Sequence, residues 1–148
     1  MHMGLVGAGL AVGTPAALAA SDGAALYAQN CAVCHQADGA GATGVAPPLM
    51  GEHWARLGAD RNYLPTVMLR GLFGAIELAG GQTFNGNMPG LAPSLDDEAV
   101  AAIASHVRKL QGAGDSAPYR THEIEALRQR PGSPTASRRM RAQLLGGG

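Results

Sequence analysis

Two cysteines and a histidine lie within five consecutive residues, Cys31-Ala32-Val33-Cys34-His35. Cysteines three positions apart face the same side of one helical turn, so their thiols can reach the two vinyl groups of a porphyrin. The histidine that follows is then placed to bind the iron through an imidazole nitrogen. The form C-x-x-C-H therefore predicts one covalently attached haem, held by Cys31 and Cys34, with His35 as the proximal iron ligand.

Three other kinds of chemistry suit a pair of nearby cysteines. A redox-active dithiol is the first, but it usually lies in a βαβ context that this sequence does not indicate. A zinc site is the second, although no second cysteine pair is present to complete a tetrahedron. A disulfide between Cys31 and Cys34 is the third, and so short a spacing strains it. These alternatives remain open, and haem is favoured over them.

The composition fits a cofactor at the centre of a small domain. The chain has 148 residues, which is enough for one domain. Hydrophobic residues make up 46% of it, but only 4% of the chain is aromatic and much of the rest is alanine, which buries little area per residue. A large flat cofactor would complete such a thin core. The formal net charge of zero argues against nucleic acid as a partner.

Helices are the elements expected to position the haem motif. Asp22 and Ser21 are the expected N-cap of the first helix, and Ser94 with Asp97 forms a capping pair for the clearest one. Loops are expected over residues 38–48 and 80–93, and no segment alternates like a strand. The predicted class is all-α, with three to four helices around one haem and with helical patterns over residues 23–30, 63–70, 95–110 and 121–130.

The two ends of the chain differ from its middle. Residues 1–20 read as a secretory signal peptide, because a short apolar run is followed by Ala17-Leu18-Ala19, with cleavage expected after Ala19 or Ala20. The haem domain is expected over residues 21–112. Residues 113–148 form a basic extension, with a net charge of +4 from Arg120 onward against −4 for residues 21–119. Beyond Pro131 no order is expected, and docking on an acidic partner or an anionic lipid is the alternative role.

Around the haem motif the sequence resembles the class I cytochromes c. The first helix carries Gly23 and Tyr27, where a small residue in that family lets the last helix cross closely. Pro47-Pro48-Leu49 is similar to the family's Pro-x-Leu segment. The resemblance implies that the Pro47 carbonyl binds the Nδ1–H of His35 and that Leu49 packs on the haem. Such a bond fixes the tautomer of the histidine and raises its basicity as a ligand.

The resemblance also implies a second axial ligand, Met88, in a Met-Pro loop that follows Asn85-Gly86-Asn87. Met50 lies too near the proximal side, and Met68 falls in a predicted helix. His53 and His106 are the alternative ligands, although a packing or solvated role is expected of both and of His122. A His/Met pair raises the haem potential and leaves no open site on the iron, as suits an electron carrier.

Two further stretches, residues 69–74 (LRGLFG) and 83–86 (TFNG), resemble cytochrome subunits that accompany respiratory dehydrogenases of alcohols and sugars. The predicted function is that of a periplasmic electron carrier, not an enzyme, with a periplasmic dehydrogenase as donor and a terminal oxidase or another cytochrome as acceptor. One alternative is the cytochrome subunit of a dehydrogenase complex. The other is a haem enzyme or sensor with an open sixth position.

One glycine-rich motif matches a dinucleotide-binding pattern but is not expected to bind a dinucleotide. Residues 39–44 (GAGATG) match the dinucleotide-binding pattern G-x-G-x-x-G, which requires a strand before it and a helix after it. Here a haem-binding helix precedes the motif, and Val45-Ala46-Pro47-Pro48 follows it. We therefore interpret the motif as a flexible loop close to the haem.

Overall fold

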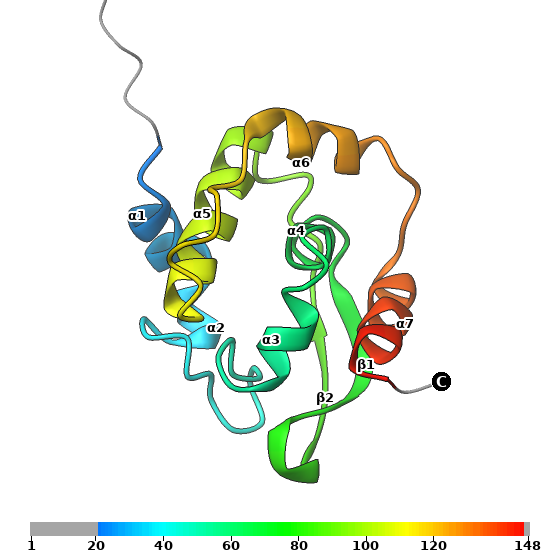
Figure 1. Cartoon of the computed structure of the whole chain (residues 1–148). Coiled ribbons are helices and arrows are strands. Elements are labelled where there is room, and N and C mark those ends of the chain that lie inside the picture. The colour runs from blue at the N-terminus through cyan, green and yellow to red at the C-terminus, as the bar shows by residue number, and fades with distance from the viewer. Residues whose placement is uncertain (1–20, 147–148) are drawn as a thin grey trace, which may run out of the picture.

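The computed structural model of the chain describes residues 21–146, so the predicted signal peptide and its cleavage site lie outside the described residues. The predicted mainly helical class is confirmed, although the described residues hold seven α-helices instead of three to four, together with one two-stranded sheet (Figure 1). In chain order the elements are α1 Gly23–Asn30, α2 Ala32–His35, α3 His53–Leu57, α4 Tyr63–Arg70, β1 Leu72–Glu77, the 3₁₀ turn η1 Ala79–Gly81, β2 Thr83–Met88, α5 Asp97–Leu110, α6 Thr121–Arg128 and α7 Pro134–Leu145.

Aspartate side chains are the N-caps of α1 and α5. Asp22 caps α1, and its side chain accepts hydrogen bonds from the backbone N–H groups of Ala24 and Ala25 at 3.0 and 3.3 Å. The capping prediction for α5 was wrong by two residues. Asp96, in place of Ser94, accepts from the Ala99 N–H at 2.8 Å, because Asp96 is the last residue with extended backbone before the helix.

A close crossing of α1 on α5 sets the frame for the haem motif. A Cβ built on Gly23 would stand 2.2 Å from the carbonyl oxygen of Ala102, so only glycine allows the two backbones to approach this far. Beside the crossing, the Tyr27 and His106 rings lie 5.2 Å apart between centroids. The predicted interhelical contact is therefore present, with His106 as the aromatic partner of Tyr27.

Helix α4 matches the predicted residues 63–70 and ends where the sequence indicated. Gly71 follows it with φ +80°, a left-handed conformation that turns the chain directly into β1. A Cβ on Gly71 would lie 2.4 Å from the carbonyl oxygen of Met88, so this glycine also lets the end of β2 pack against the end of α4.

The antiparallel pair β1–β2 was not predicted, and the loop expected over residues 80–93 was wrong for its first half. The strands pair Leu72 with Met88 and Ile76 with Phe84, with Gly74 opposite Gly86. These residues share one face of the hairpin because side chains alternate along a strand. Gly74 and Gly86 interrupt this face, and glycine and asparagine are uncommon in strands, so the alternation was obscured in the sequence.

The C-terminal extension is ordered through Gly146, which contradicts the prediction of no order beyond Pro131. Helix α6 agrees with the expected residues 121–130 to within its last turn. Ser133 is the N-cap of α7, and its side chain accepts from the Ala136 N–H at 3.2 Å, with Pro134 at the first helical position. It packs on β1, α3 and α4, as Figure 1 shows at the end of the chain.

Two arginines of the extension are held by contacts within the fold and do not lie free in solvent. Arg128 donates to the Asp97 carboxylate at 2.6 Å and to the backbone carbonyls of Ala92 and Leu95. Arg141 is buried, with 4% of its surface exposed. Within residues 21–146, no helix is long and apolar enough to cross a membrane.

Candidate haem site

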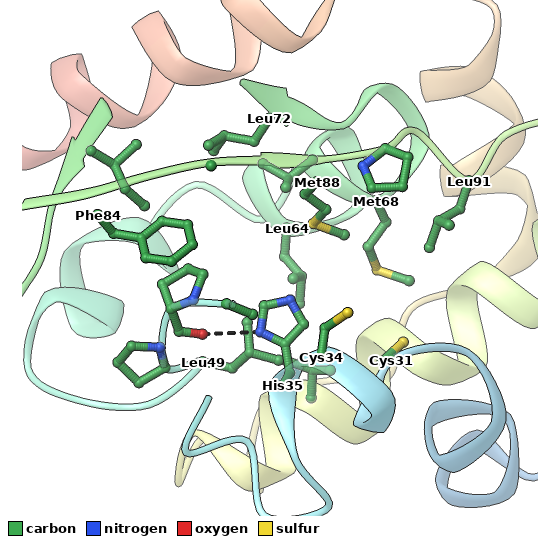
Figure 2. A pocket seen from close by; sticks show the side chains of 18 of the residues that line it. Cys31, Cys34, His35, Leu49, Leu64, Met68, Leu72, Phe84, Met88 and Leu91 are labelled. Atoms are coloured by element: carbon green, nitrogen blue, oxygen red, sulfur yellow. Dashed lines mark hydrogen bonds between the residues drawn. The ribbon is translucent and has the colours of Figure 1, made fainter. Parts of the chain in front are cut away.

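A cavity that is partly open to solvent lies between the C-x-x-C-H segment and the hairpin. Figure 2 shows His35 and the two cysteines on one side of the cavity and the hairpin residues on the other. The lining is mainly apolar and comes from α1, α2, the 45–49 loop, α3, α4, the hairpin and its exit to Leu91, α5 and α7.

His35 is buried in the proximal wall and fixed by one hydrogen bond. Its Nδ1 lies 3.0 Å from the carbonyl oxygen of Pro47, drawn as the dashed line in Figure 2. A carbonyl only accepts, so Nδ1 carries the proton and Nε2 keeps a free lone pair. Burial lowers the pKa of His35, and the bond to Pro47 opposes this in part. A neutral imidazole of fixed tautomer is the form that binds a metal.

The cysteines next to His35 are free thiols at the edge of the cavity. Burial, followed by the nearby Cys34, raises the pKa of the Cys31 thiol to about 11. A redox-active dithiol needs a lowered pKa, so this environment argues against that alternative. Among residues 21–146 there is no group of three or more histidines, cysteines and acidic residues able to hold a metal ion, so a zinc site lacks its ligand set there.

Two methionines line the cavity across from His35. Met88 is the last residue of β2, and Met68 extends from α4 beside it (Figure 2). The sequence argument set Met68 aside because it lies in a helix, yet that helix turns its side chain to the cavity. His35 is the one histidine among the described lining residues.

The two alternative histidine ligands lie elsewhere. His53 is 7% exposed at the start of α3, with its ring 5.7 Å from that of Trp54. His106, on α5, lies against Tyr27 with the two rings tilted toward each other. Neither side chain is among those that line the cavity.

Several lining residues were missed by sequence reasoning. Leu64 and Met68 are four apart on α4, a spacing that places both on one helix face and that the sequence did offer. Tyr63 and Trp54 contact each other at 6.0 Å between ring centroids and also line the cavity. Arg141 lines it from α7, and no pattern in the sequence distinguishes this arginine from its exposed neighbours.

The glycine-rich motif at residues 39–44 is a loop, as interpreted from the sequence. It follows α2 and contains one isolated bridge, between Ala42 and Ala46, with no strand before it and no helix after it. The loop brings Pro47 to His35, since the Gly41 N–H donates to the His35 carbonyl at 2.9 Å and the Leu49 N–H to Gly39 at 2.8 Å.

Comparison with known proteins decides the family. The sequence matches the family model for cytochrome c over residues 20–111, which is more than half of the chain. The chain belongs to the cytochrome c family. It is 41% identical over 125 residues to cytochrome c-552 of Thermus thermophilus, covering 80% of this cytochrome and 82% of that protein.

Two other relatives are parts of dehydrogenases. The cytochrome is 32% identical over 117 residues to the cytochrome c subunit of a quinone alcohol dehydrogenase of Gluconobacter oxydans, covering 78% of this chain. It is 29% identical over 110 residues to the gluconate 2-dehydrogenase cytochrome c subunit of Pantoea cypripedii, covering 72% of this chain. The cytochrome spans only 23% and 24% of these two subunits.

Family membership establishes the cofactor and the general function. The cytochrome carries covalently bound c-type haem and transfers electrons, with other redox proteins as its partners. The residues present fit this group, because a mainly apolar cavity has two thiols and an imidazole of fixed tautomer at one wall. The predicted family and cofactor are thus confirmed.

Proposed function

We propose that the cytochrome carries single electrons in the periplasm, with Cys31 and Cys34 as thioether links, His35 as the proximal ligand and Met88 as the distal ligand. One observation carries this assignment. A histidine held by a backbone carbonyl at 3.0 Å and a methionine at the end of a strand line the same apolar cavity from facing walls. When bound, the haem iron supplies the change between the ferric and ferrous states.

The protein's own residues set the conditions for that change. The apolar lining excludes water and lowers the local dielectric, which together with the axial ligands sets the potential. The bond from His35 Nδ1 to Pro47 raises the basicity of the proximal ligand. Val33, which is 79% exposed between the two cysteines, marks where a partner can approach this edge of the cavity.

The optical spectrum of the mature protein, produced with a c-type maturation system, tests the assignment. We expect sharp α and β bands on reduction, haem that stays on the chain through acid-acetone extraction, and the weak far-red band of a methionine–ferric bond. Covalent haem without the far-red band, together with tight cyanide binding, would contradict Met88 and favour an open sixth site. Absence of covalent haem would contradict the whole proposal.

The choice between the two methionines of the distal wall is tested separately. Met88→Ala should abolish the far-red band and lower the midpoint potential, because the thioether ligand favours the ferrous state. Met68→Leu keeps the volume and should keep the band, since a buried Leu for Met replacement usually costs less than ~1.5 kcal/mol. If Met68→Leu loses the band and Met88→Ala retains it, the distal ligand is Met68.

A permanent place in a dehydrogenase complex is the second candidate, favoured by the relatives from Gluconobacter oxydans and Pantoea cypripedii. Under this proposal the donor is a periplasmic dehydrogenase subunit, and the exposed basic residues of the extension contact it. Purification of the chromosomally tagged cytochrome from its own host tests it. Recovery with a large dehydrogenase subunit in equal amount supports the complex, and recovery as a lone chain supports a diffusing carrier that delivers electrons to a terminal oxidase or another cytochrome.

Periplasmic location rests on the predicted signal peptide, residues 1–20, together with the need for thioether formation outside the cytoplasm in this proposal. Mass spectrometry of the purified holoprotein checks it. A chain that begins at Ala20 or Ser21 supports cleavage and release, whereas a chain that retains residues 1–20 contradicts it.

A further inference from the structure

Arg141 is a buried charge from the C-terminal extension that lies in the wall of the haem cavity. Only 4% of its surface is exposed, and it lines the cavity from α7. Its Nη1 lies 3.5 Å from the Tyr63 hydroxyl, and its Nη2 donates to the backbone carbonyl of Glu77 at 3.0 Å. Its Nε is buried without a hydrogen-bond partner.

No carboxylate of the described residues neutralises this guanidinium. The ion pairs formed within residues 21–146 join Arg61 to Glu123 and Arg128 to Asp97. Glu77 offers Arg141 its backbone carbonyl and keeps its own side chain exposed. A buried charge without an opposite charge is strongly unfavourable, and an orphaned N–H adds to the cost. The arrangement therefore calls for an anion that residues 21–146 do not provide.

The surroundings of Arg141 form one polar end of an otherwise apolar cavity. The Tyr63 hydroxyl accepts from Arg141 and keeps its own hydrogen to donate. Burial raises the pKa of Tyr63, so the hydroxyl stays protonated, while Arg141 opposes that shift. Arg141 also adds to the effect of burial in lowering the pKa of His53. Two donors, Arg141 and Tyr63, thus face the same space with a positive potential.

The haem brings carboxylates of its own. They are its propionates, which extend from the side of the porphyrin opposite the vinyl groups. Cys31 and Cys34, which take the vinyl groups, lie across the cavity from Phe84 and the hairpin in Figure 2, and α7 packs on that hairpin in Figure 1. A haem attached to Cys31 and Cys34 through its vinyl groups would direct its propionates toward the end of the cavity that Arg141 lines.

We infer that Arg141 and Tyr63 bind a haem propionate, so that α7 completes the cofactor site from outside the region that matches the family model. This inference rests on the proposed haem attachment at Cys31 and Cys34. It gives the extension a defined role: α7 supplies the counter-charge of the cofactor and holds the propionate end of the cavity closed.

Holoprotein variants test this role through two properties of the haem itself. Arg141→Gln should lower the midpoint potential, because a nearby positive charge favours the reduced iron. It should also shift the propionate carboxylate bands in the redox-difference infrared spectrum. Arg141→Lys should recover part of the potential, and Tyr63→Phe should shift the bands alone. Arg139→Gln, at an exposed position of the same helix, is the matched control and should change neither property.

The outcomes separate the inference from the proposed function. Covalent haem with equal potentials and unchanged carboxylate bands in Arg141→Gln and Arg139→Gln would overturn the inference and leave the electron carrier intact. Absence of covalent haem in the unaltered chain would overturn the proposed function itself. If Arg141→Gln loses its native circular dichroism, the comparison of Arg141→Lys and Tyr63→Phe with the control decides, and unchanged bands in both overturn the inference.

Discussion

The proximal wall of the haem cavity comes from one short stretch of sequence, whereas the distal wall is assembled from three separated segments. The proximal wall is residues 31–49, in which His35 and its hydrogen-bond partner Pro47 are 12 positions apart. The distal wall consists of α4, the β1–β2 hairpin and α7, which reaches it from the end of the described chain. A ligand set can therefore be local on one side of a cofactor and depend on tertiary packing on the other.

The two walls differ in which contacts orient the ligand side chain. His35 is oriented by a loop that its own neighbours fold, through backbone hydrogen bonds of residues 39–49. Met88 is oriented by strand register and by Gly71, the glycine between α4 and β1. Substitutions far from the haem are thus expected to displace the distal ligand more than the proximal one.

We expect the largest effect, the loss of covalent haem, from substitutions in the proximal wall. The double variant Cys31→Ala/Cys34→Ala should lose all covalent haem, because both thioether bonds are removed, and each single variant should retain a smaller amount. Val33→Ala, at an exposed position between them, should keep the normal amount. Haem staining of a denaturing gel measures the result. Haem that remains on the double variant would place the attachment elsewhere.

This contrast also explains what sequence alone could predict. The covalent haem, the cap at Asp22, the helix over residues 63–70 and its end at Gly71 depend on neighbours in the sequence and were predicted correctly. The hairpin was missed because glycine and asparagine hide the period-two pattern of Leu72, Ile76, Phe84 and Met88.

Helix α7 was missed for a different reason. Its apolar stripe is narrow: Ala136, Met140 and Leu144 are at helical spacing, and five polar or charged residues lie between them. The burial of Arg141 had no signal, because arginine is usually exposed and only the tertiary fold shows that this one faces a cavity.

A second prediction tests the distal wall through its backbone. Gly71→Ala should destabilise the cytochrome by about 1–3 kcal/mol, because φ is +80° and the new Cβ would meet the Met88 carbonyl. The far-red band should weaken as Met88 is displaced. Denaturant unfolding and the optical spectrum of the holoprotein measure the two effects.

Gly80 provides the matched control for that variant. Its φ is +81°, and nothing lies within 4 Å of a Cβ built on it. Gly80→Ala therefore adds the backbone strain without the collision and should leave the far-red band unchanged. Equal effects of the two variants would show that the contact of Gly71 with Met88 does not position the ligand.

The smallest expected effect concerns how the extension is fastened to the haem domain. The hydrogen bond from Arg61 lowers the pKa of Glu123 to about 2, below the ordinary ~4.3 of an unfolded chain. The stabilisation is therefore complete above pH 5 or so and is lost as pH falls through the range from ~4.3 to about 2. Both side chains are partly exposed, so we expect Glu123→Gln to cost about 1 kcal/mol at neutral pH.

Acid-dependent unfolding of the holoprotein checks this expectation. The stability difference between the unaltered chain and Glu123→Gln should shrink as pH falls toward about 2. Glu125→Gln, at an exposed position of the same helix, should show little difference at any pH. A constant difference across this range would mean that the Arg61–Glu123 pair does not hold α6 in place.

The hairpin that carries Met88 has a kinetic consequence for the cytochrome. In the part of the chain that the structure describes, its strands pair only with each other, and a two-stranded sheet by itself is marginally stable in water. We therefore expect the backbone amides of β1 and β2 to exchange hydrogen through local opening, at a lower free energy than those of the α1–α5 crossing. Replacement of the distal methionine by an external ligand such as imidazole then proceeds at the rate at which this sheet opens, whatever the concentration of the ligand once it is in excess.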